Sequence, residues 1–168
     1  MARESVTDEW KVIITDKYWI NKSGDVWNGS YFMKTWIHKG YKELTLQIDK
    51  KKRHFMIHTL LARVFIPNPL NKPFVDHING DKLDNRLENL RYATHSENTA
   101  NRKKCNSETG YKGVSMTHNG KYKSSICHQG KSYYLGVFDT PKEAHDAYCK
   151  KGKELHKEFH NPGIISVL

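Results

Sequence analysis

The segment FVDHINGDKLDNRLENLRYATHSENTANR, residues 74–102, contains an adjacent Asp-His pair, a run of asparagines and a helix start. Two short apolar runs, residues 74–75 and 90–93, flank a long polar loop that carries the turn signal Asn79-Gly80. Short apolar runs on either side of such a loop are typical of two strands. The segment therefore predicts a two-stranded unit that leads directly into a helix.

A capping box predicts where this helix begins. Thr94 is a good N-cap, and Glu97 follows three residues later, so each side chain can satisfy an unpaired N–H in the first turn. Asn98 then lies in the first helical turn. Asn101 and Arg102 are expected on the same face, because they follow it by three and four positions. The whole segment is predicted to be a ββα unit.

Five side chains of this segment match the needs of phosphodiester hydrolysis, which are an activated water, a charge sink and stabilisation of the leaving oxygen. Asp76 and Asn98 offer hard oxygen ligands of the kind that Mg²⁺ or Mn²⁺ prefers. His77 can deprotonate a water near neutral pH. Arg91 and Arg102 can contact flanking phosphates.

A purely structural role is the alternative for these polar residues. Turn formation accounts well for Asn79, Asp81, Asp84 and Asn85, because these residue types close turns with their own side chains. It does not account for an Asp-His pair in register with a later asparagine, Asn89, and a helix-start asparagine. We therefore favour a catalytic site.

The composition favours a polyanionic partner. The 168-residue chain holds 28 Lys and Arg against 18 Asp and Glu, a formal charge of +10, and basic side chains on phosphates release condensed counterions. Five of the acids lie between Asp76 and Glu97, which suggests a cation beside bound phosphate. No apolar run predicts a membrane span or a signal peptide. Three cysteines without a CxxC pair support neither a disulfide framework nor a cysteine zinc site.

The N-terminal part is predicted to form short strands and then a helix. Its tryptophans recur every eight or nine residues, which suits short strands with an aromatic core; they are Trp10, Trp19, Trp27 and Trp36. Between Met56 and Phe65 the apolar residues recur at helical spacing, and Pro67 ends the helix. His58 lies at the edge of the apolar face, where we favour a packed structural histidine over a metal ligand; such a histidine can still support the site from behind.

The C-terminal part is predicted to be a separate domain. Residues 103–110 lack apolar periodicity and hold turn formers, so we divide the chain into domains 1–104 and 105–168. Thr140 caps a later helix. Three strand-like runs precede that helix, at residues 111–116, 121–127 and 132–138. A three-stranded antiparallel sheet packed on one helix results, and the fold class of the chain is α+β.

The stretch VDHINGDKLDNRLENLRYATHSENTANR resembles the HNH nuclease motif in the form found in phage and intron-encoded homing endonucleases. The similarity extends over roughly residues 10–104. It implies that His77 is the general base and that Asp76 and Asn98 are the metal ligands. It also implies that Asn89 ties the loop and helps to orient the histidine. Asp and Asn stand where some members have histidines, which favours one Mg²⁺ or Mn²⁺ over zinc.

A second resemblance covers about residues 110–161. The stretches YKGV, NGKY, YLGVFDT and EAHDAY are similar to the APETALA/ethylene-response-factor (AP2/ERF-like) DNA-binding domain. In that family a sheet lies in the major groove and alternate strand residues read bases. A basic sheet that reads no bases is the alternative. The implied DNA-facing positions are Ser115, Thr117, Asn119, Ser125, Cys127, Ser132 and Tyr134, with Lys121 and Lys123 on phosphates.

Together these features predict a metal-dependent, site-specific DNA endonuclease with double-stranded DNA as its partner, in the host cytoplasm of a phage or microbe. Asn101 joins Arg91 and Arg102 as a predicted DNA contact. A DNA-binding regulator without activity is the alternative, and an RNA-binding protein is a third class. The oligomeric state is left open between a monomer and a homodimer. The type of cleavage is likewise left open between a nick in one strand and a double-strand cut. Removal of residues 106–168 is expected to weaken DNA binding without removing the chemistry.

Overall fold

The computed structural model describes residues 9–14, 16–102 and 107–163. Packing divides the chain into two compact units, Met1–Tyr92 and Ala93–Leu168. This division lies before the boundary between domains 1–104 and 105–168 that the sequence predicts, and that boundary stays a prediction. The mixture of small sheets and helices confirms the predicted α+β class. No helix within the described ranges is both long and apolar enough to cross a membrane.

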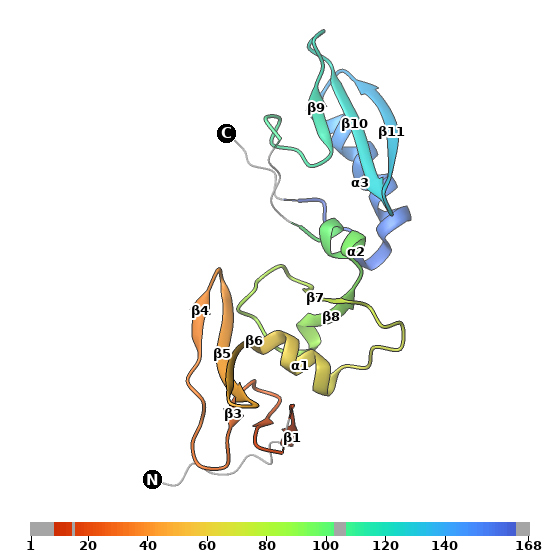
Figure 1. Ribbon diagram of the computed structural model, residues 1–168. Coiled ribbons are helices and arrows are strands. Elements are labelled where there is room, and N and C mark those ends of the chain that lie inside the picture. Colours follow the sequence, from red (N-terminus) through yellow and green to blue (C-terminus); the bar gives the residue numbers. More distant parts are fainter. Residues whose placement is uncertain (1–8, 15, 103–106, 164–168) are drawn as a thin grey trace. The chain divides into compact units, whose positions relative to one another are not determined.

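The first unit combines small sheets with one helix (Figure 1). Its elements are β1 (Lys11–Val12), β2 (Trp19–Ile20), β3 (Val26–Trp27), β4 (Trp36–His38), β5 (Tyr41–Ile48), β6 (Lys51–Met56), α1 (Ile57–Phe65), β7 (Phe74–His77), η1 (Leu87–Asn89) and β8 (Leu90–Ala93). Two antiparallel sheets, ordered β1-β2-β3 and β4-β5-β6, precede α1. The two-stranded sheet β7-β8 follows it, as the ββα pattern predicts.

The core of the first unit is aliphatic. Leu44 and Leu46 on β5, and Ile57 and Leu61 on α1, are completely buried. They share one side because alternate residues of a strand and one stripe of a helix face the same way. The predicted helix is confirmed, and His58 within it is only 5% exposed, as expected of a packed histidine.

The predicted aromatic core is wrong. Trp10, Trp27 and Trp36 are 36% to 39% exposed. The strands β2 and β3 contain only two residues each, and they bury the smaller side chains of Ile20 and Val26. Such short strands offer too little covered surface for indole rings, which therefore lie at the surface of the unit.

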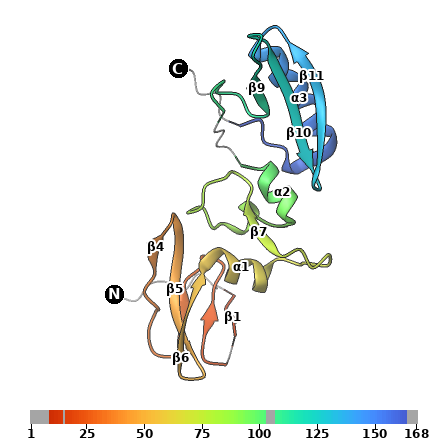
Figure 2. The same cartoon turned by 45° about the horizontal axis from the view of Figure 1, so that its top comes forward.

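The second unit is a sheet backed by a helix (Figure 2). Its elements are α2 (His95–Ala100), β9 (Val114–Met116), β10 (Tyr122–His128), β11 (Lys131–Phe138), α3 (Pro141–His156) and η2 (Lys157–Phe159). The strands form an antiparallel sheet ordered β11-β10-β9. Helix α3 covers one face, where Ser124 and Ile126 of β10 are buried. The predicted three-stranded sheet on one helix is therefore confirmed.

Helix α2 begins as predicted but ends early. The Thr94 and Glu97 side chains each accept a hydrogen bond from the other residue's backbone N–H, which confirms the capping box. The helix contains six residues, and Asn101 is its C-cap. Arg102 therefore lies beyond the last turn, and the expectation that it shares a helical face with Asn98 is wrong.

Gly113, which precedes β9, provides a test of how tightly α3 packs on the sheet. An added Cβ would overlap the ring of Tyr148 on α3, and the backbone already has a φ of +76°. We expect Gly113→Ala to lower the free energy of unfolding of the second unit by about 3 kcal/mol or more, because strain and overlap add.

Gly120 is the matched control, because its φ is +77° and an added Cβ meets nothing within 4 Å. Gly120→Ala is expected to cost only about 1 kcal/mol of backbone strain. Urea unfolding followed by circular dichroism measures both values, and equal losses would contradict this packing.

Candidate active site

Asp76 and His77 end β7, and both side chains are buried. From the neighbouring β8, the Nε of Arg91 donates a hydrogen bond of 2.9 Å to Asp76 Oδ2, and its Nη2 lies 2.9 Å from the same oxygen. Arg91 was predicted to contact a phosphate, but its guanidinium is engaged with Asp76 here. This ion pair compensates the carboxylate for its burial and fixes its direction.

The side chain of Asn89 ties the loop between β7 and β8. Its Oδ1 accepts a hydrogen bond from the N–H of Asn79 at 3.0 Å, and its Nδ2 donates to Asn79 Oδ1 at 3.0 Å and to the carbonyl of Asp84 at 2.7 Å. The backbone carbonyl of Asn89 also accepts from the N–H of Ile78 at 2.8 Å. The brace that the resemblance implied is therefore present in the geometry.

A second layer of polar contacts stiffens the same loop. The Nδ2 of Asn79 donates to Asp84 Oδ2 at 2.7 Å, and Arg86 contacts both Asp84 oxygens at 2.8 Å. The hydrogen bond from Arg86 holds the pKa of the Asp84 carboxyl well below its usual range. Asn79 and Asp84 therefore act as the turn formers that the sequence predicts.

One nitrogen of the His77 ring is fixed by a residue whose contact the sequence did not predict. Nε2 lies 3.0 Å from Oδ1 of Asn85. Because an amide oxygen only accepts, this pairing puts the proton on Nε2, and the lone pair of the neutral ring is then on Nδ1. Asn85 was interpreted only as a turn former, since no spacing rule links it to the histidine.

Two aromatic rings lie behind His77. The centroid of the His58 ring is 4.8 Å from that of His77, and the Tyr41 ring lies 5.1 Å from His58 and 6.2 Å from His77. Burial, and secondarily the charge of His77, lower the pKa of His58 to about 4. His58 is therefore neutral near pH 7 and adds no positive charge next to His77.

The other predicted metal ligand, Asn98, lies in the second unit on α2 and is half-buried. In the described ranges, no three His, Cys, Asp or Glu side chains are grouped to hold a metal ion. The two predicted ligands, one carboxylate and one amide, would be a sparse set of hard oxygen donors. Such a set suits Mg²⁺, which keeps several water ligands, better than zinc, which takes three or four nitrogen, sulfur or carboxylate ligands.

The structure brings several predicted DNA-facing residues of β9, β10 and β11 together. Lys123 pairs with Ser115 across the sheet, and Ser125 pairs with Tyr134, whose ring lies under the Lys123 ammonium at 5.9 Å. These residues alternate along β10 with the buried side chains, so they lie on the face away from α3. Ser132 pairs with Cys127 on the same strands.

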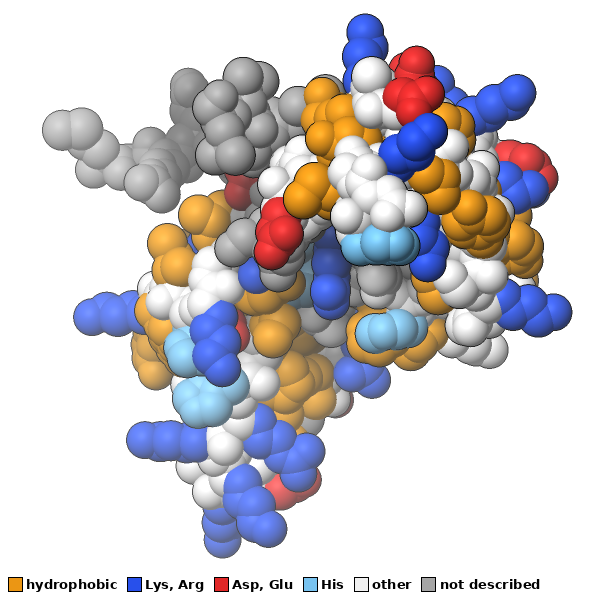
Figure 3. All heavy atoms as spheres, turned by 90° about the horizontal axis from the view of Figure 1, so that it is seen from above, with side chains coloured by type: hydrophobic (Ala, Val, Ile, Leu, Met, Phe, Trp, Pro, Cys, Tyr) orange, Lys and Arg blue, Asp and Glu red, His pale blue; other side chains and the backbone are white. Residues whose placement is uncertain are grey.

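The remaining predicted contacts differ in their surroundings. Lys121 forms a 2.9 Å ion pair with Asp139, and the Thr117 hydroxyl donates to the carbonyl of Lys121. Asn119 is exposed in the turn between β9 and β10. Asn101 is buried and accepts a hydrogen bond from Asn161, which is typical of a structural side chain. Figure 3 shows Lys and Arg side chains projecting at many points of the visible surface, among fewer Asp and Glu.

Comparison with known proteins identifies relatives of the motif. A family profile described as HNH endonuclease matches residues 64–100. The chain is 27% identical over 158 residues to the uncharacterized HNH endonuclease L560 of Acanthamoeba polyphaga mimivirus, covering 94% of this chain and 72% of that protein. It is 32% identical over 88 residues to Protein 3.8 of Escherichia phage T7, covering 51% of this chain and 72% of that protein.

A solved structure is also similar. It concerns DNA binding and cleavage by the HNH homing endonuclease I-HmuI, with a TM-score of 0.50 and 31% sequence identity. The similarity covers 55% of this chain and 56% of that chain, so this chain spans little more than half of the I-HmuI chain.

The buried His58 makes the stability of the first unit depend on pH. Above pH 6.5 the His58 ring is neutral whether the chain is folded or unfolded. As the pH falls from about 6.5 to 4, only the unfolded chain takes up the proton, so the free energy of unfolding decreases. We expect a loss of roughly 2 to 4 kcal/mol across this range. His58→Gln should remove that part of the pH dependence.

Urea unfolding followed by tryptophan fluorescence measures this effect in the first unit, because all four tryptophans belong to it. His38→Gln is the control, since His38 is exposed on β4. A wild-type pH slope in His58→Gln would show that another group is responsible.

Proposed function

Because the chain belongs to the HNH endonuclease family, we propose that it is a site-specific DNA endonuclease of the homing type that depends on one divalent cation. The observation that carries this proposal is the end of β7. There the buried His77 is held through Nε2 by Asn85, next to the buried carboxylate of Asp76 in the sequence. A fixed imidazole close to a hard oxygen ligand meets the needs of metal-assisted phosphodiester hydrolysis.

His77 acts as the general base in this proposal. Its Nδ1 takes the proton of the attacking water, while Nε2 keeps its own proton and donates it in a hydrogen bond to Asn85 Oδ1. The ring then becomes a cation, and the neutral His58 behind it does not oppose that charge. Asn89 acts indirectly, because it holds the loop in which Asn85 lies.

Asp76 and Asn98 are the proposed ligands of the cation, which is Mg²⁺ or Mn²⁺ rather than zinc. When bound, the cation supplies positive charge at the phosphate and at the leaving 3′-oxygen. Arg91 orients the Asp76 carboxylate through its two contacts with Oδ2. The cation would share the Asp76 carboxylate with the Arg91 guanidinium. Because the two positive charges compete for it, the ion is expected to bind weakly and to exchange.

Double-stranded DNA is the proposed partner, and the second unit extends the contact surface as an AP2/ERF-like domain. The exposed face of β9, β10 and β11 supports this, because Lys123, Ser115 and Tyr134 lie together on it. Lys121 and Lys123 contact phosphates in this proposal, and Arg102 follows the ligand helix. One site per chain cuts one strand per binding event, so a double-strand cut needs a second chain or a second event.

Substitution of the proposed catalytic residues tests this function. We expect His77→Ala to slow the nicking of supercoiled plasmid in Mg²⁺ by about 10²- to 10⁴-fold, because general-base catalysis contributes that much. Asp76→Ala and Asn98→Ala should abolish cleavage while DNA binding in EDTA stays within about twofold of wild type.

His38→Ala serves as the histidine control and should cleave like wild type. Equal and negligible nicking by wild type and His77→Ala would instead favour a DNA-binding regulator. Preference for structured RNA over duplex DNA at matched salt would indicate the RNA-binding class.

The assignment of Nδ1 as the basic atom predicts a change in pH dependence. Asn85→Asp places a carboxylate on Nε2–H, which favours the imidazolium form. The acid limb of the cleavage rate should therefore move to higher pH by about one unit. Cleavage rates between pH 5 and 9 measure this, and a lower plateau with an unmoved acid limb would contradict the contact.

A further inference from the structure

The helix that carries Asn98 is too short to be stable alone. Helix α2 contains six residues, whereas isolated helices shorter than about 12 residues are marginal in water. Its N-terminus is secured by the capping box of Thr94 and Glu97. The last carbonyls of any helix lack intrahelical partners, so the C-terminal end of α2 needs donors from elsewhere.

The side chain of Lys112 supplies these donors. Its Nζ donates to the carbonyl of Ala100 at 2.7 Å, to that of Arg102 at 2.8 Å and to that of Asn161 at 2.9 Å. An ammonium has three N–H donors, so three carbonyls match its capacity. A positive charge at the C-terminal end of a helix is also favoured by the helix dipole.

This ammonium joins three separated parts of the chain in the second unit. Ala100 is the last residue of α2 and Arg102 lies two positions beyond it, Lys112 precedes β9, and Asn161 follows η2. Its charge also extends to a neighbouring histidine, since burial and then Lys112 lower the pKa of His160 to about 4. Lys112 is therefore a central internal group, although its sequence context predicted a DNA-binding sheet.

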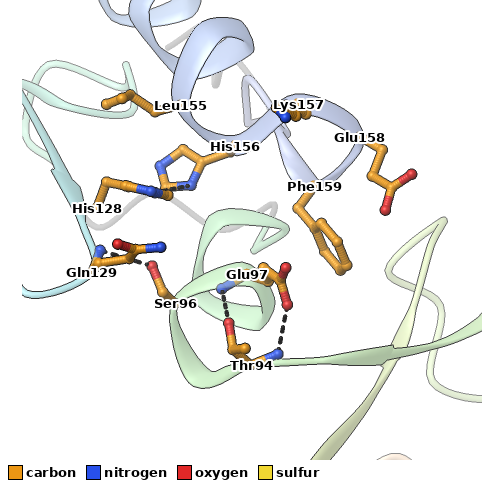
Figure 4. Close-up of a pocket in the computed structure, with 10 residues that line it drawn as sticks. All are labelled: Thr94, Ser96, Glu97, His128, Gln129, Leu155, His156, Lys157, Glu158 and Phe159. Atoms are coloured by element: carbon orange, nitrogen blue, oxygen red, sulfur yellow. Dashed lines mark hydrogen bonds between the residues drawn. The ribbon is translucent and has the colours of Figure 1, made fainter. Parts of the chain in front are cut away.

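Further contacts within the second unit hold α2. Phe159 is buried against Ala93 and Ala100, and the Ser96 hydroxyl accepts a hydrogen bond from the N–H of Gln129 at 3.2 Å. Figure 4 shows Ser96 and Glu97 of α2 lining one side of a pocket whose other walls include Gln129 and Phe159. Apart from Ala93, these contacts of α2 are all made by residues that follow position 106.

We propose that Lys112 is a positioning residue for the metal ligand Asn98, because it fixes the C-terminal end of α2 from the part of the chain that follows residue 106. The metal-binding part of this inference rests on the proposed function, whereas the ordering of α2 does not. The part of the chain after residue 106 then helps to form the catalytic site, because it holds the helix that carries Asn98. Removal of residues 106–168 therefore removes the chemistry as well, opposite to the expectation from the sequence.

The test compares full-length Lys112→Met with wild type. The methionine keeps much of the length of the side chain and loses the three donors. We expect amide hydrogen exchange of residues 95–101 to rise about tenfold or more while α3 stays protected. The Mg²⁺ concentration for half-maximal plasmid nicking should also rise about tenfold, while the duplex DNA affinity in EDTA changes by less than about threefold.

Lys150→Met is the charge-matched control, because Lys150 is exposed on α3. It should leave both the exchange of residues 95–101 and the Mg²⁺ requirement as in wild type. Unchanged exchange of residues 95–101 in Lys112→Met would overturn the proposal. Raised exchange with an unchanged Mg²⁺ requirement would also overturn it, since α2 would then be ordered by Lys112 without effect on the metal.

A conservative variant covers the case in which Lys112→Met also exposes α3. Lys112→Arg keeps the charge, but its planar guanidinium cannot direct donors as a compact ammonium does. Exchange raised only in residues 95–101 supports the proposal, and wild-type exchange there overturns it. If wild type nicks no plasmid, the proposed function fails, and the exchange data still decide whether Lys112 orders α2.

Discussion

The tie between Asn89 and the loop that follows β7 is the contact on which the candidate site depends. Strands β7 and β8 have four residues each, and the loop between them is polar, so little apolar burial holds it. One amide side chain satisfies the Asn79 N–H and the Asp84 carbonyl, and a buried polar group left without a partner costs about 1 to 3 kcal/mol. Without this tie, the loop would lose the shape that places Asn85 against His77.

Charge is distributed differently from what composition suggests. The acids between Asp76 and Glu97 suggested a cation beside bound phosphate, yet Asp76 is paired with Arg91 and Asp84 with Arg86. Both of these carboxylates therefore already have an arginine partner within the motif. In the second unit the Lys112 ammonium donates to three backbone carbonyls, whose dipoles stabilise its charge.

Local features of the sequence predicted local structure well. The helical spacing identified α1, the capping box of Thr94 and Glu97 identified the start of α2, and Thr140 identified the start of α3. The resemblance also identified Asn89 as a brace, because the motif fixes its spacing from His77.

Contacts between residues that no sequence periodicity relates could not be predicted from the sequence. The pairing of Asn85 with His77 depends on how the loop folds back, and the rings of Tyr41 and His58 come from different elements. Helix α2 directly follows a motif strand, so it was assigned to the nuclease part, whereas its packing partners lie up to 60 positions further along the chain. The exposure of the tryptophans depends on strand length, which spacing alone does not give.

The Asn79-Gly80 turn also bears on how long the protein remains chemically intact. An asparagine followed by glycine is a site of spontaneous deamidation, because the small glycine lets its backbone nitrogen attack the side-chain amide. Here that nitrogen already donates to the carbonyl of His77 at 2.8 Å, and the Asn79 amide is held by Asn89 and Asp84. The hydrogen bonds that shape the loop therefore also slow the deamidation of Asn79. If the loop loosened, deamidation would turn Asn79 into a carboxylate that faces Asp84.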